Sequence, residues 1–523
     1  MRGARKTALP GRPRPPLAHR LHKFLFALSP LTPRLLVVSN RLPIVLERKS
    51  HGWGLKPGAG GLVSALAPVL SHRGGLWIGW PGLPLERGGA WEGVLAEGYR
   101  ERGYELVPVL LSEDEVKGFY EGFANAILWP LFHDLLGQCN FDPSFWYAYL
   151  KVNEKFADCV IHHGRDEDFI WVQDYQLIHV AEYARRQRES ARIGFFLHIP
   201  FPPLDILLKL PWRGQILQAF LAYDLLGFQT PRDTRNFLTC IASLLPEAEI
   251  HDGGAITEVR LGSRSVRVGA FPIGIDFQSY EDAARSEDVT RRRVELRERM
   301  GPRQLIVGVD RLDYAKGLVE RLKAFRNALQ RHKELREQAI LFQVVVPSRE
   351  GVPEYQSLKA DIERLVGEIN GEFSTAGWVP VHYHYKSLAR RDLLALYRLA
   401  RVCFVTSIKD GMNLVAKEFC AVQVDGCGVL VLSEFAGAAA QLQVGALLVN
   451  PHDIEGMADA LKAAFDMDED ERRARMERMR EVVREQDIFW WVDYYLQAAL
   501  GTVPDDFRAM KEYLPPIVIE EYL

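Results

Sequence analysis

The sequence is short of the features that mark several common protein classes. Its six cysteines show no Cys-x-x-Cys spacing, so we expect reduced thiols and neither a zinc site nor disulfides. The apolar patch near the N-terminus, residues 24–28, is far too short to span a membrane. The glycine-rich loop at residues 58–61 does not match the Gly-x-Gly-x-x-Gly dinucleotide fingerprint, which gives little support to a nicotinamide cofactor.

Acidic residues are missing from the N-terminus. Residues 1–34 contain eight Lys or Arg and no Asp or Glu, which leaves 57 of the 65 basic residues against all 68 acidic ones in the rest of the chain. A body with this excess of acid is a poor nucleic-acid binder. We expect the Pro- and Arg-rich segment to be a disordered tail, with an organelle-targeting peptide or a mistaken translation start as alternatives. We expect the body to be cytoplasmic and not attached to a membrane.

A strand, a tight loop and a helix are predicted between residues 402 and 419. A β-rich apolar run ends before Asp410-Gly411, and an apolar run suited to a buried helix begins near Asn413. The free amides of a helix's first turn favour a phosphate group, and Asp410 is placed to accept hydrogen bonds from sugar hydroxyls. Glu418, about one turn further along the helix, could reach a ribose. The same pattern also fits an ordinary α/β loop.

Two more places in the first half of the chain show polar loops after strands. The β-branched run 35–41 precedes the glycine-rich loop and an apolar helix, which Pro68 is expected to bend or end early. The strands expected at 169–175 and 193–202 end in polar residues. Because ligands bind beyond the carboxyl ends of parallel strands, Asp174 and His198 are candidates for chemistry, with a purely structural role as the alternative for His198.

A second block begins after residue 276. A charged helix near residues 285–300 leads into a new strand, and strands then alternate with helices. This alternation predicts a second doubly wound parallel domain. Arg311 and Lys316 follow the first strand of this block and could neutralise a diphosphate, although two basic residues on a loop often just face solvent.

Eleven motifs give the chain a family resemblance. In order they are VVSNRLP, GAGGLVSAL, GLWIGWPG, FANAILWPLFH, WVQDYQL, IGFFLHIPFP, DLLGFQT, FPIGID, DRLDYAKGL, DGMNLVAKEF and VLSEFAGAA. This series, which runs unbroken from residue 35 to about residue 500, resembles the trehalose-6-phosphate synthase family of retaining glycosyltransferases. The resemblance implies an α/β fold of two Rossmann-like doubly wound domains facing across a cleft, the GT-B type.

The resemblance also implies the domain limits. The expected divisions are a disordered tail at 1–34, an acceptor domain at 35–276, a nucleotide-sugar domain at 277–488, and a final segment at 489–523 whose helix crosses back to the first domain.

The resemblance assigns residues to two substrates. For a nucleoside diphosphate glucose donor they are Gly60, Gly61, Arg311, Lys316, Asp410, Gly411, Met412, Asn413, Leu414, Val415 and Glu418. For a glucose 6-phosphate acceptor they are Arg41, Tyr120, Trp129, Asp174 and Arg349. The expected catalytic residues are His198, Asp410, Arg311 and Lys316. In this scheme His198 contacts the donor glucose near the bond that breaks.

The implied reaction moves glucose to the anomeric hydroxyl of glucose 6-phosphate with retention, giving trehalose 6-phosphate and a nucleoside diphosphate. UDP-glucose is the first candidate donor, with GDP- and ADP-glucose as alternatives, and neither a metal nor a cofactor is expected. A separate trehalose-6-phosphate phosphatase is expected downstream, because the sequence shows no phosphatase-type aspartate motif. The oligomeric state is open, with a homo-oligomer as one possibility.

Three positions depart from the family pattern. Gln173 and Gln176 flank Asp174 where the family often has histidines, and Gln441 stands where a Glu before Leu442 is usual. The change at residue 441 removes a charge close to the donor loop. Two alternatives therefore stay open: a related transferase with another phosphorylated acceptor, such as glycerol 3-phosphate, and a regulatory homologue that binds sugar phosphates without turnover.

Overall fold

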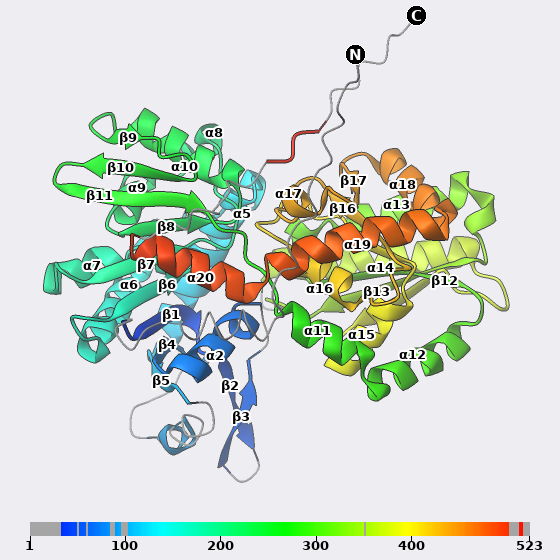
Figure 1. Cartoon of the computed structure of the whole chain (residues 1–523), viewed down its shortest axis with the longest axis horizontal. Coiled ribbons are helices and arrows are strands. Elements are labelled where there is room, and N and C mark those ends of the chain that lie inside the picture. Colours follow the sequence, from blue (N-terminus) through cyan, green and yellow to red (C-terminus); the bar gives the residue numbers. More distant parts are fainter. Residues whose placement is uncertain are drawn as a thin grey trace, which may run out of the picture.

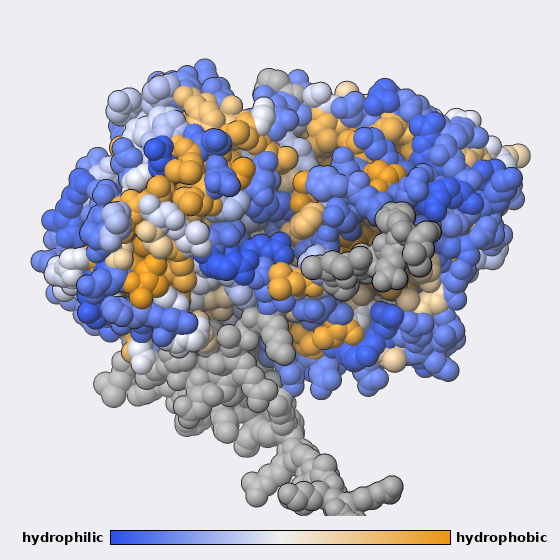
Figure 2. Space-filling view, turned by 90° about the horizontal axis from the view of Figure 1, so that it is seen from above, coloured by the Kyte–Doolittle hydropathy of each residue, from blue (hydrophilic) through white to orange (hydrophobic). Residues whose placement is uncertain are grey.

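The computed structural model describes residues 33–49, 52–58, 61–83, 89–95, 103–349, 352–501 and 512–515. They form two halves that lie side by side, each built on its own β-sheet with helices on its faces (Figure 1). Seen from above, the surface of both halves is largely hydrophilic with scattered hydrophobic patches (Figure 2). In the described part of the chain, no helix is both long and apolar enough to cross a membrane.

The first half contains a nine-stranded sheet in the order β5-β4-β1-β6-β7-β8-β11-β10-β9. Its strands are β1 (Leu35–Arg41), β4 (Leu76–Trp80), β5 (Glu105–Pro108), β6 (Phe169–Gln173), β7 (Arg192–Phe196), β8 (Leu225–Phe228), β9 (Glu249–His251), β10 (Ile256–Leu261) and β11 (Arg264–Ala270). Strands from β5 to β11 pair in parallel, and β10 is antiparallel to both neighbours. A separate hairpin joins β2 (Ile44–Lys49) to β3 (Gly52–Pro57).

Helices connect these strands. They are α2 (Gly61–Arg73), α4 (Glu113–Glu115), the π-helix η1 (Val116–Leu128), α5 (Trp129–Phe132), η2 (Leu136–Gln138), α6 (Pro143–His163), η3 (Tyr175–Leu177), α7 (Val180–Gln187), α8 (Leu204–Leu207), α9 (Arg213–Phe220) and α10 (Pro231–Leu244). Because parallel strands need crossovers on both faces, β1 and β6 are buried almost throughout, as their continuous apolar sequence requires.

The second half contains a six-stranded, wholly parallel sheet in the order β14-β13-β12-β15-β16-β17. Its strands are β12 (Gln304–Arg311), β13 (Ala339–Val346), β14 (Val381–Tyr385), β15 (Val402–Val405), β16 (Val429–Ser433) and β17 (Leu447–Val449). Its helices are α11 (Phe277–Arg285), α12 (Glu287–Met300), η4 (Tyr314–Lys316), α13 (Leu318–Arg331), η5 (Lys333–Leu335), α14 (Pro353–Phe373), α15 (Arg390–Leu399), α16 (Leu414–Val422), α17 (Ala439–Leu442), α18 (Ile454–Asp466) and α19 (Glu469–Glu485). The predicted fold of two Rossmann-like domains is confirmed.

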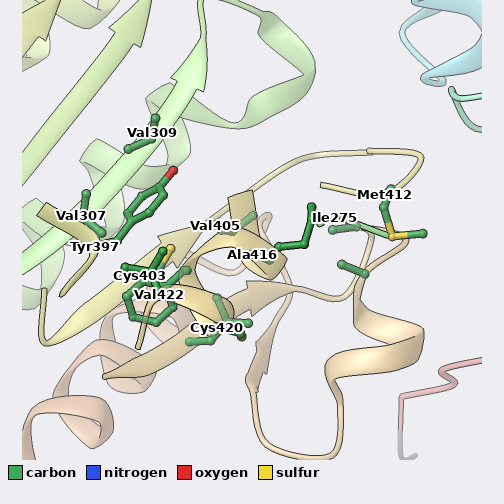
Figure 3. Close-up of a cluster of buried hydrophobic side chains, with 14 of the residues drawn as sticks. Ile275, Val307, Val309, Tyr397, Cys403, Val405, Met412, Ala416, Cys420 and Val422 are labelled. Carbon is green, nitrogen blue, oxygen red and sulfur yellow. The ribbon is translucent and has the colours of Figure 1, made fainter. Parts of the chain in front are cut away.

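The core of the second half fixes α16 against the sheet. Val307 of β12, Cys403 of β15 and Ala416 of α16 are buried, and they lie in one cluster with the neighbouring side chains of Figure 3. Since burying a side chain the size of valine stabilises the fold by roughly 1.5–3 kcal/mol, this cluster holds the loop that leads into α16 beyond the strand ends.

Within the described residues, the chain passes from one half to the other at two places. In the first, Ile273 donates its amide to Gln229 Oε1 at 3.0 Å, and its carbonyl accepts Lys417 Nζ at 2.6 Å. In the second, α20 (Ile488–Ala499) follows α19 and crosses to the first half (Figure 1). There the Trp491 indole donates to Phe271 O at 3.1 Å.

The structure differs from the sequence-based expectation at the end of one helix. α2 continues through Pro68 to Arg73, because Leu66 and Leu70 are buried on its inner face and offset the roughly 3 kcal/mol that an internal proline costs. β15 spans Val402–Val405 and so ends within the apolar run that predicts it. The backbone leaves the sheet there, and the amide of Ile408 bonds Ala315 O at 2.8 Å instead of a strand.

Candidate active site

The loop before α16 has the predicted shape of a phosphate-binding helix start. Asn413 caps the helix: its φ is 77°, and its side chain accepts the amide of Ala416 at 3.1 Å. The amides of Leu414 and Val415 belong to the first turn and have no carbonyl to bond within the helix. This end of α16 therefore offers N–H groups and the positive end of the helix dipole to an anion.

Asp410 lies in this loop with a fixed ionic partner. Its Oδ2 is 2.5 Å from Lys316 Nζ and 3.1 Å from Asn413 Nδ2, and the side chains of the ion pair are only 12% and 14% exposed. Burial alone would raise the pKa of the Asp410 carboxyl, but the charge of Lys316 overcomes it and lowers the pKa. Asp410 is thus a carboxylate at neutral pH, held in one orientation as a hydrogen-bond acceptor.

Two glycines bring the halves into contact at this loop. A Cβ added at Gly411 would overlap the carbonyl oxygen of His198, and one added at Gly61 would overlap the side chain of Leu414. At Gly411 the neighbour is backbone, so only glycine allows this approach, whereas at Gly61 the neighbour is the end of a leucine side chain. The predicted glycine-rich loop near the start of the chain thus meets the predicted loop before α16, although Gly60 lies outside the described residues.

His198 is a neutral imidazole with both nitrogens engaged. Burial lowers its pKa to about 3. Gln229 presents its amide nitrogen to Nδ1 at 3.4 Å because its own oxygen is taken by Ile273. The proton therefore sits on Nε2, which is 2.9 Å from Gln173 Oε1. The ring is fixed by its neighbours and is not poised to take up a proton at neutral pH.

Glu418 lies about one helical turn into α16. Its two oxygens accept the phenols of Tyr280 at 2.9 Å and Tyr397 at 3.5 Å. Burial raises the pKa of Glu418, and the two phenols oppose that rise. The carboxyl group is accordingly oriented by neutral donors that leave acceptor capacity for a ligand.

On the first half, Arg41 lies against aromatic rings at the end of β1. Its guanidinium carbon is 4.1 Å from the centre of the Trp80 ring and 5.6 Å from that of Tyr120. Burial alone would raise the pKa of the Tyr120 phenol, yet that pKa is lowered by the positive charge of Arg349, Arg41 and Arg311. Three cations from two halves therefore create a positive potential around one phenol.

Arg349 approaches the Tyr120 phenol from the second half. Its guanidinium carbon is 4.5 Å from the centre of the Trp129 ring, and its nitrogens bond the phenol of Tyr355 and, at 3.4 Å, that of Tyr175. Its φ is 49°, a left-handed conformation that is uncommon for a residue with a side chain. Arg311 also lies over Trp129, at 5.7 Å, with its side chain half exposed.

Asp174 sits at the end of β6 in a conformation usual for glycine. Its φ is 72°, and its carboxylate accepts the amide of His198 at 3.1 Å. Burial raises the pKa of Asp174 to about 6, against the lowering effect of the amides around it. A strained backbone together with a carboxylate whose charged form is disfavoured by burial is typical of functional sites.

Most of the predicted site residues within the described chain contact another predicted site residue. Contacts link Arg41 to Tyr120, Trp129 to Arg349 and Arg311, Asp174 to His198, His198 to Gly411, and Lys316 to Asp410. A pocket that both halves line runs past Asp410. The roles assigned to these residues remain predictions.

Sequence reasoning missed several supporting residues. Tyr280 and Tyr397 orient Glu418, Gln229 orients His198, and Tyr355 holds Arg349. None of them belongs to a local pattern with Glu418, His198 or Arg349, apart from Tyr355, which opens a helix soon after Arg349.

The departures from the family pattern have structural consequences. Gln173 uses its oxygen on His198, and its nitrogen has no partner among the described residues. Gln441 donates to the side chain of Gln486, and its own oxygen is buried without a partner in the same set. No group of three potential metal ligands occurs in the described residues.

The fold and the site together define a class. Two Rossmann-like domains that face each other, with a buried carboxylate, several cations and helix-start amides between them, are the architecture of a glycosyltransferase that uses a nucleotide sugar.

Comparison with known proteins gives the family. The model of glycosyltransferase family 20 matches residues 33–500. The trehalose-6-phosphate synthase of Mycolicibacterium vanbaalenii is 43% identical over 475 residues, which cover 90% of this chain and 96% of that protein. That of Mycobacterium marinum is 44% identical over 480 residues, covering 90% and 94%. The chain therefore belongs to glycosyltransferase family 20.

Solved structures of similar proteins agree with this family assignment. An α,α-trehalose-phosphate synthase (UDP-forming) from Burkholderia xenovorans, in complex with glucose 6-phosphate, is 36% identical with a TM-score of 0.81 and covers 90% of this chain and 100% of its own. An Escherichia coli protein bound with UDP-2-fluoro glucose is 34% identical with a TM-score of 0.79, covering 90% and 100%.

Proposed function

We propose that the protein transfers glucose from UDP-glucose to glucose 6-phosphate with retention, forming trehalose 6-phosphate and UDP. Relatives at 43% and 44% identity over 90% of the chain carry the name trehalose-6-phosphate synthase. The similar structure with glucose 6-phosphate bound is called UDP-forming, which favours uridine as the donor base.

The observation that carries the proposal is the meeting of the two halves at Asp410. The loop of the second half supplies a carboxylate and helix amides, and Gly411 of that loop contacts His198 of the first half. In this arrangement the donor sugar can lie between the diphosphate site and the second substrate. A module that only binds one sugar phosphate needs no such junction.

The donor roles follow from the chemistry of each group. Arg311, Lys316 and the amides of Leu414 and Val415 bind the diphosphate, because cations and helix starts favour phosphate. Asp410, together with the backbone of Gly411, Met412 and Asn413, holds the glucose hydroxyls, with the Gly60-Gly61 loop above the nucleotide sugar. Glu418 binds the ribose, and the neutral His198 contacts the glucose near the anomeric carbon.

The acceptor roles use the other side of the cleft. Arg41, Tyr120 and Arg349 bind the phosphate of glucose 6-phosphate, and Trp129 and Asp174 contact its sugar ring. The positive potential around Tyr120 and the buried carboxyl of Asp174 support this division.

In the reaction, the bond from the anomeric carbon to the diphosphate oxygen breaks, and a bond to the anomeric oxygen of the acceptor forms on the same face. The proton of that hydroxyl passes to the departing diphosphate. Arg311, Lys316 and the helix amides stabilise the negative charge that develops on the leaving group. Asp410 fixes the hydroxyls while positive charge develops at the anomeric carbon.

The wider assignments are part of the same proposal. We divide the domains at residue 276, since α11 begins at Phe277 and packs with α16 of the second half. We propose that the protein acts in the cytoplasm, that a separate phosphatase consumes its product, and that a homo-oligomer is one state to examine.

The test is to incubate the purified chain with UDP-, GDP- or ADP-glucose and glucose 6-phosphate, and to identify the product by mass spectrometry and NMR. We expect trehalose 6-phosphate with both anomeric centres α, fastest with UDP-glucose. Product formed only with glycerol 3-phosphate would favour the related transferase. Binding of both substrates without turnover would favour the regulatory homologue.

A further inference from the structure

We propose that Lys409 and Asp134 form a latch between the two halves that positions the donor-side Asp410 relative to the acceptor. This role rests on the proposed function. Lys409 Nζ lies 2.6 Å from Asp134 Oδ2, and the two side chains are 16% and 41% exposed. Lys409 directly precedes Asp410 in the second half, whereas Asp134 follows α5 in the first half. The latch thus lies one residue from the proposed catalytic carboxylate.

The first-half end of the latch is rigidly attached to Trp129. Asp134 has a φ of 61° and donates its amide to Leu131 O at 3.1 Å. Its neighbour His133 bonds Trp129 O through Nδ1 at 2.7 Å, and the two rings lie 4.3 Å apart. Because the turn is folded onto α5, a displacement of Asp134 also displaces Trp129, the proposed contact of the acceptor sugar.

The second-half end is equally fixed. The amide of Ile408 bonds Ala315 O at 2.8 Å, and the amide of Asp410 bonds Phe435 O at 3.2 Å. Both neighbours of Lys409 are therefore tied to the second half, and its side chain reaches the first half. The pair joins the loop that holds the donor sugar to the turn that supports the acceptor.

Lys409 and Asp134 are positioning residues that act through their neighbours. Misplacing reacting groups by about 1 Å can cost roughly a hundredfold in rate. Without the latch, the donor loop and the acceptor turn lose one of the contacts that fix their relative placement, and water competes better for the donor's anomeric carbon. Loss of the latch should therefore reduce transfer more than donor hydrolysis.

The test compares Lys409→Met, Asp134→Asn and the double variant with wild type, measuring transfer kcat, donor hydrolysis and melting temperature. We expect each single change to lower transfer kcat by about tenfold and to raise the share of donor lost to water. The double variant should lose no more than the worse single, because paired residues are not additive. Lys409→Arg should keep at least half of the activity.

The matched control is Lys155→Met, which removes a Lys–Glu contact of the same length, 2.6 Å to Glu115, within the first half. It should stay within twofold of wild type. Normal kcat in the single variants, losses that multiply in the double variant, or a melting-temperature fall larger than that of the control would overturn the latch alone. A wild-type protein that forms no trehalose 6-phosphate would overturn the proposed function and the latch with it.

Discussion

The proposed donor and acceptor sides of the cleft hold their charged groups in different ways. On the donor side, charges and polar groups are bonded to one another: Asp410 is 2.5 Å from Lys316, and Glu418 accepts the phenol of Tyr280 at 2.9 Å. On the acceptor side, the cations lie on aromatic rings, and Arg41 is stacked 4.1 Å from the Trp80 ring centre.

The difference matches the ligands that each side is proposed to bind. An aromatic face attracts a guanidinium without consuming all of its N–H donors, which stay available for a doubly charged phosphate. Sugar hydroxyls are neutral and need acceptors whose direction is already set, which is what paired carboxylates provide. The stacked cations of the acceptor side thus suit a phosphate, and the paired carboxylates of the donor side suit sugar hydroxyls, while Arg311, Lys316 and the helix amides are left for the donor diphosphate.

Asp410→Asn should have the largest effect, because it tests orientation at the reacting sugar. Removing one electrostatic contact to a transition state typically costs about 100- to 1,000-fold in kcat, and we expect a loss in that range. Steady-state kinetics at saturating donor measure it, with melting temperature as the check on folding. Normal turnover would show that this side does not act on the chemical step.

Arg349→Ala tests the stacked cations. Losing one partner of a desolvated charged pair costs about 2–4 kcal/mol, which should appear in kcat/KM for glucose 6-phosphate. Hydrolysis of donor in the absence of acceptor should change far less. Arg349→Lys, which keeps the charge but not the planar fork, should be intermediate. If both activities fell equally, Arg349 would belong to the donor side.

Asp174→Asn tests whether the buried carboxylate of Asp174, on the acceptor side, destabilises the folded protein. Its pKa is raised from 3.8 to about 6 by burial, so the folded protein binds this proton more tightly than the unfolded chain. Tighter proton binding at Asp174 adds its full contribution to the free energy of unfolding below about pH 4, and this contribution is lost as the pH rises through 6. The variant should therefore match wild type at pH 4 and be more stable by roughly 2–3 kcal/mol at pH 7.5. Denaturant titrations at both pH values measure this, and a difference that does not change with pH would refute it.

Glu418→Gln should have the smallest effect, because it changes a contact to a part of the donor that does not react. We expect the KM for UDP-glucose to rise by about tenfold with kcat little changed, since uniform binding is lost. Tyr280→Phe, which removes only an orienting phenol, should shift the KM in the same direction by less. A loss of kcat equal to that of Asp410→Asn would erase the distinction between the two donor carboxylates.

Local signals were sufficient for much of this site. Asn413 was expected at the helix start and is its cap, because capping depends on a few adjacent residues. The hydrogen bond from the amide of Ile408 to the carbonyl of Ala315 could not be predicted, since the two residues are far apart in the sequence. Likewise nothing near Asp134 announces its contact with Lys409, which exists only after the two halves have docked. The helix does not end at Pro68, because the burial of Leu66 and Leu70 offsets the cost of a proline inside a helix.

Left-handed backbone conformations gather around the cleft. Of the five non-glycine residues with positive φ in the described part of the chain, Asp134, Asp174, Arg349 and Asn413 belong to the proposed site or its latch. Glycine at such positions relieves strain, so each is a place where a substitution could raise heat resistance. Each also removes a side chain on which turnover is proposed to depend. Directed evolution for thermal survival would therefore select glycine at these four positions, and the variants that survive heating would be slower enzymes.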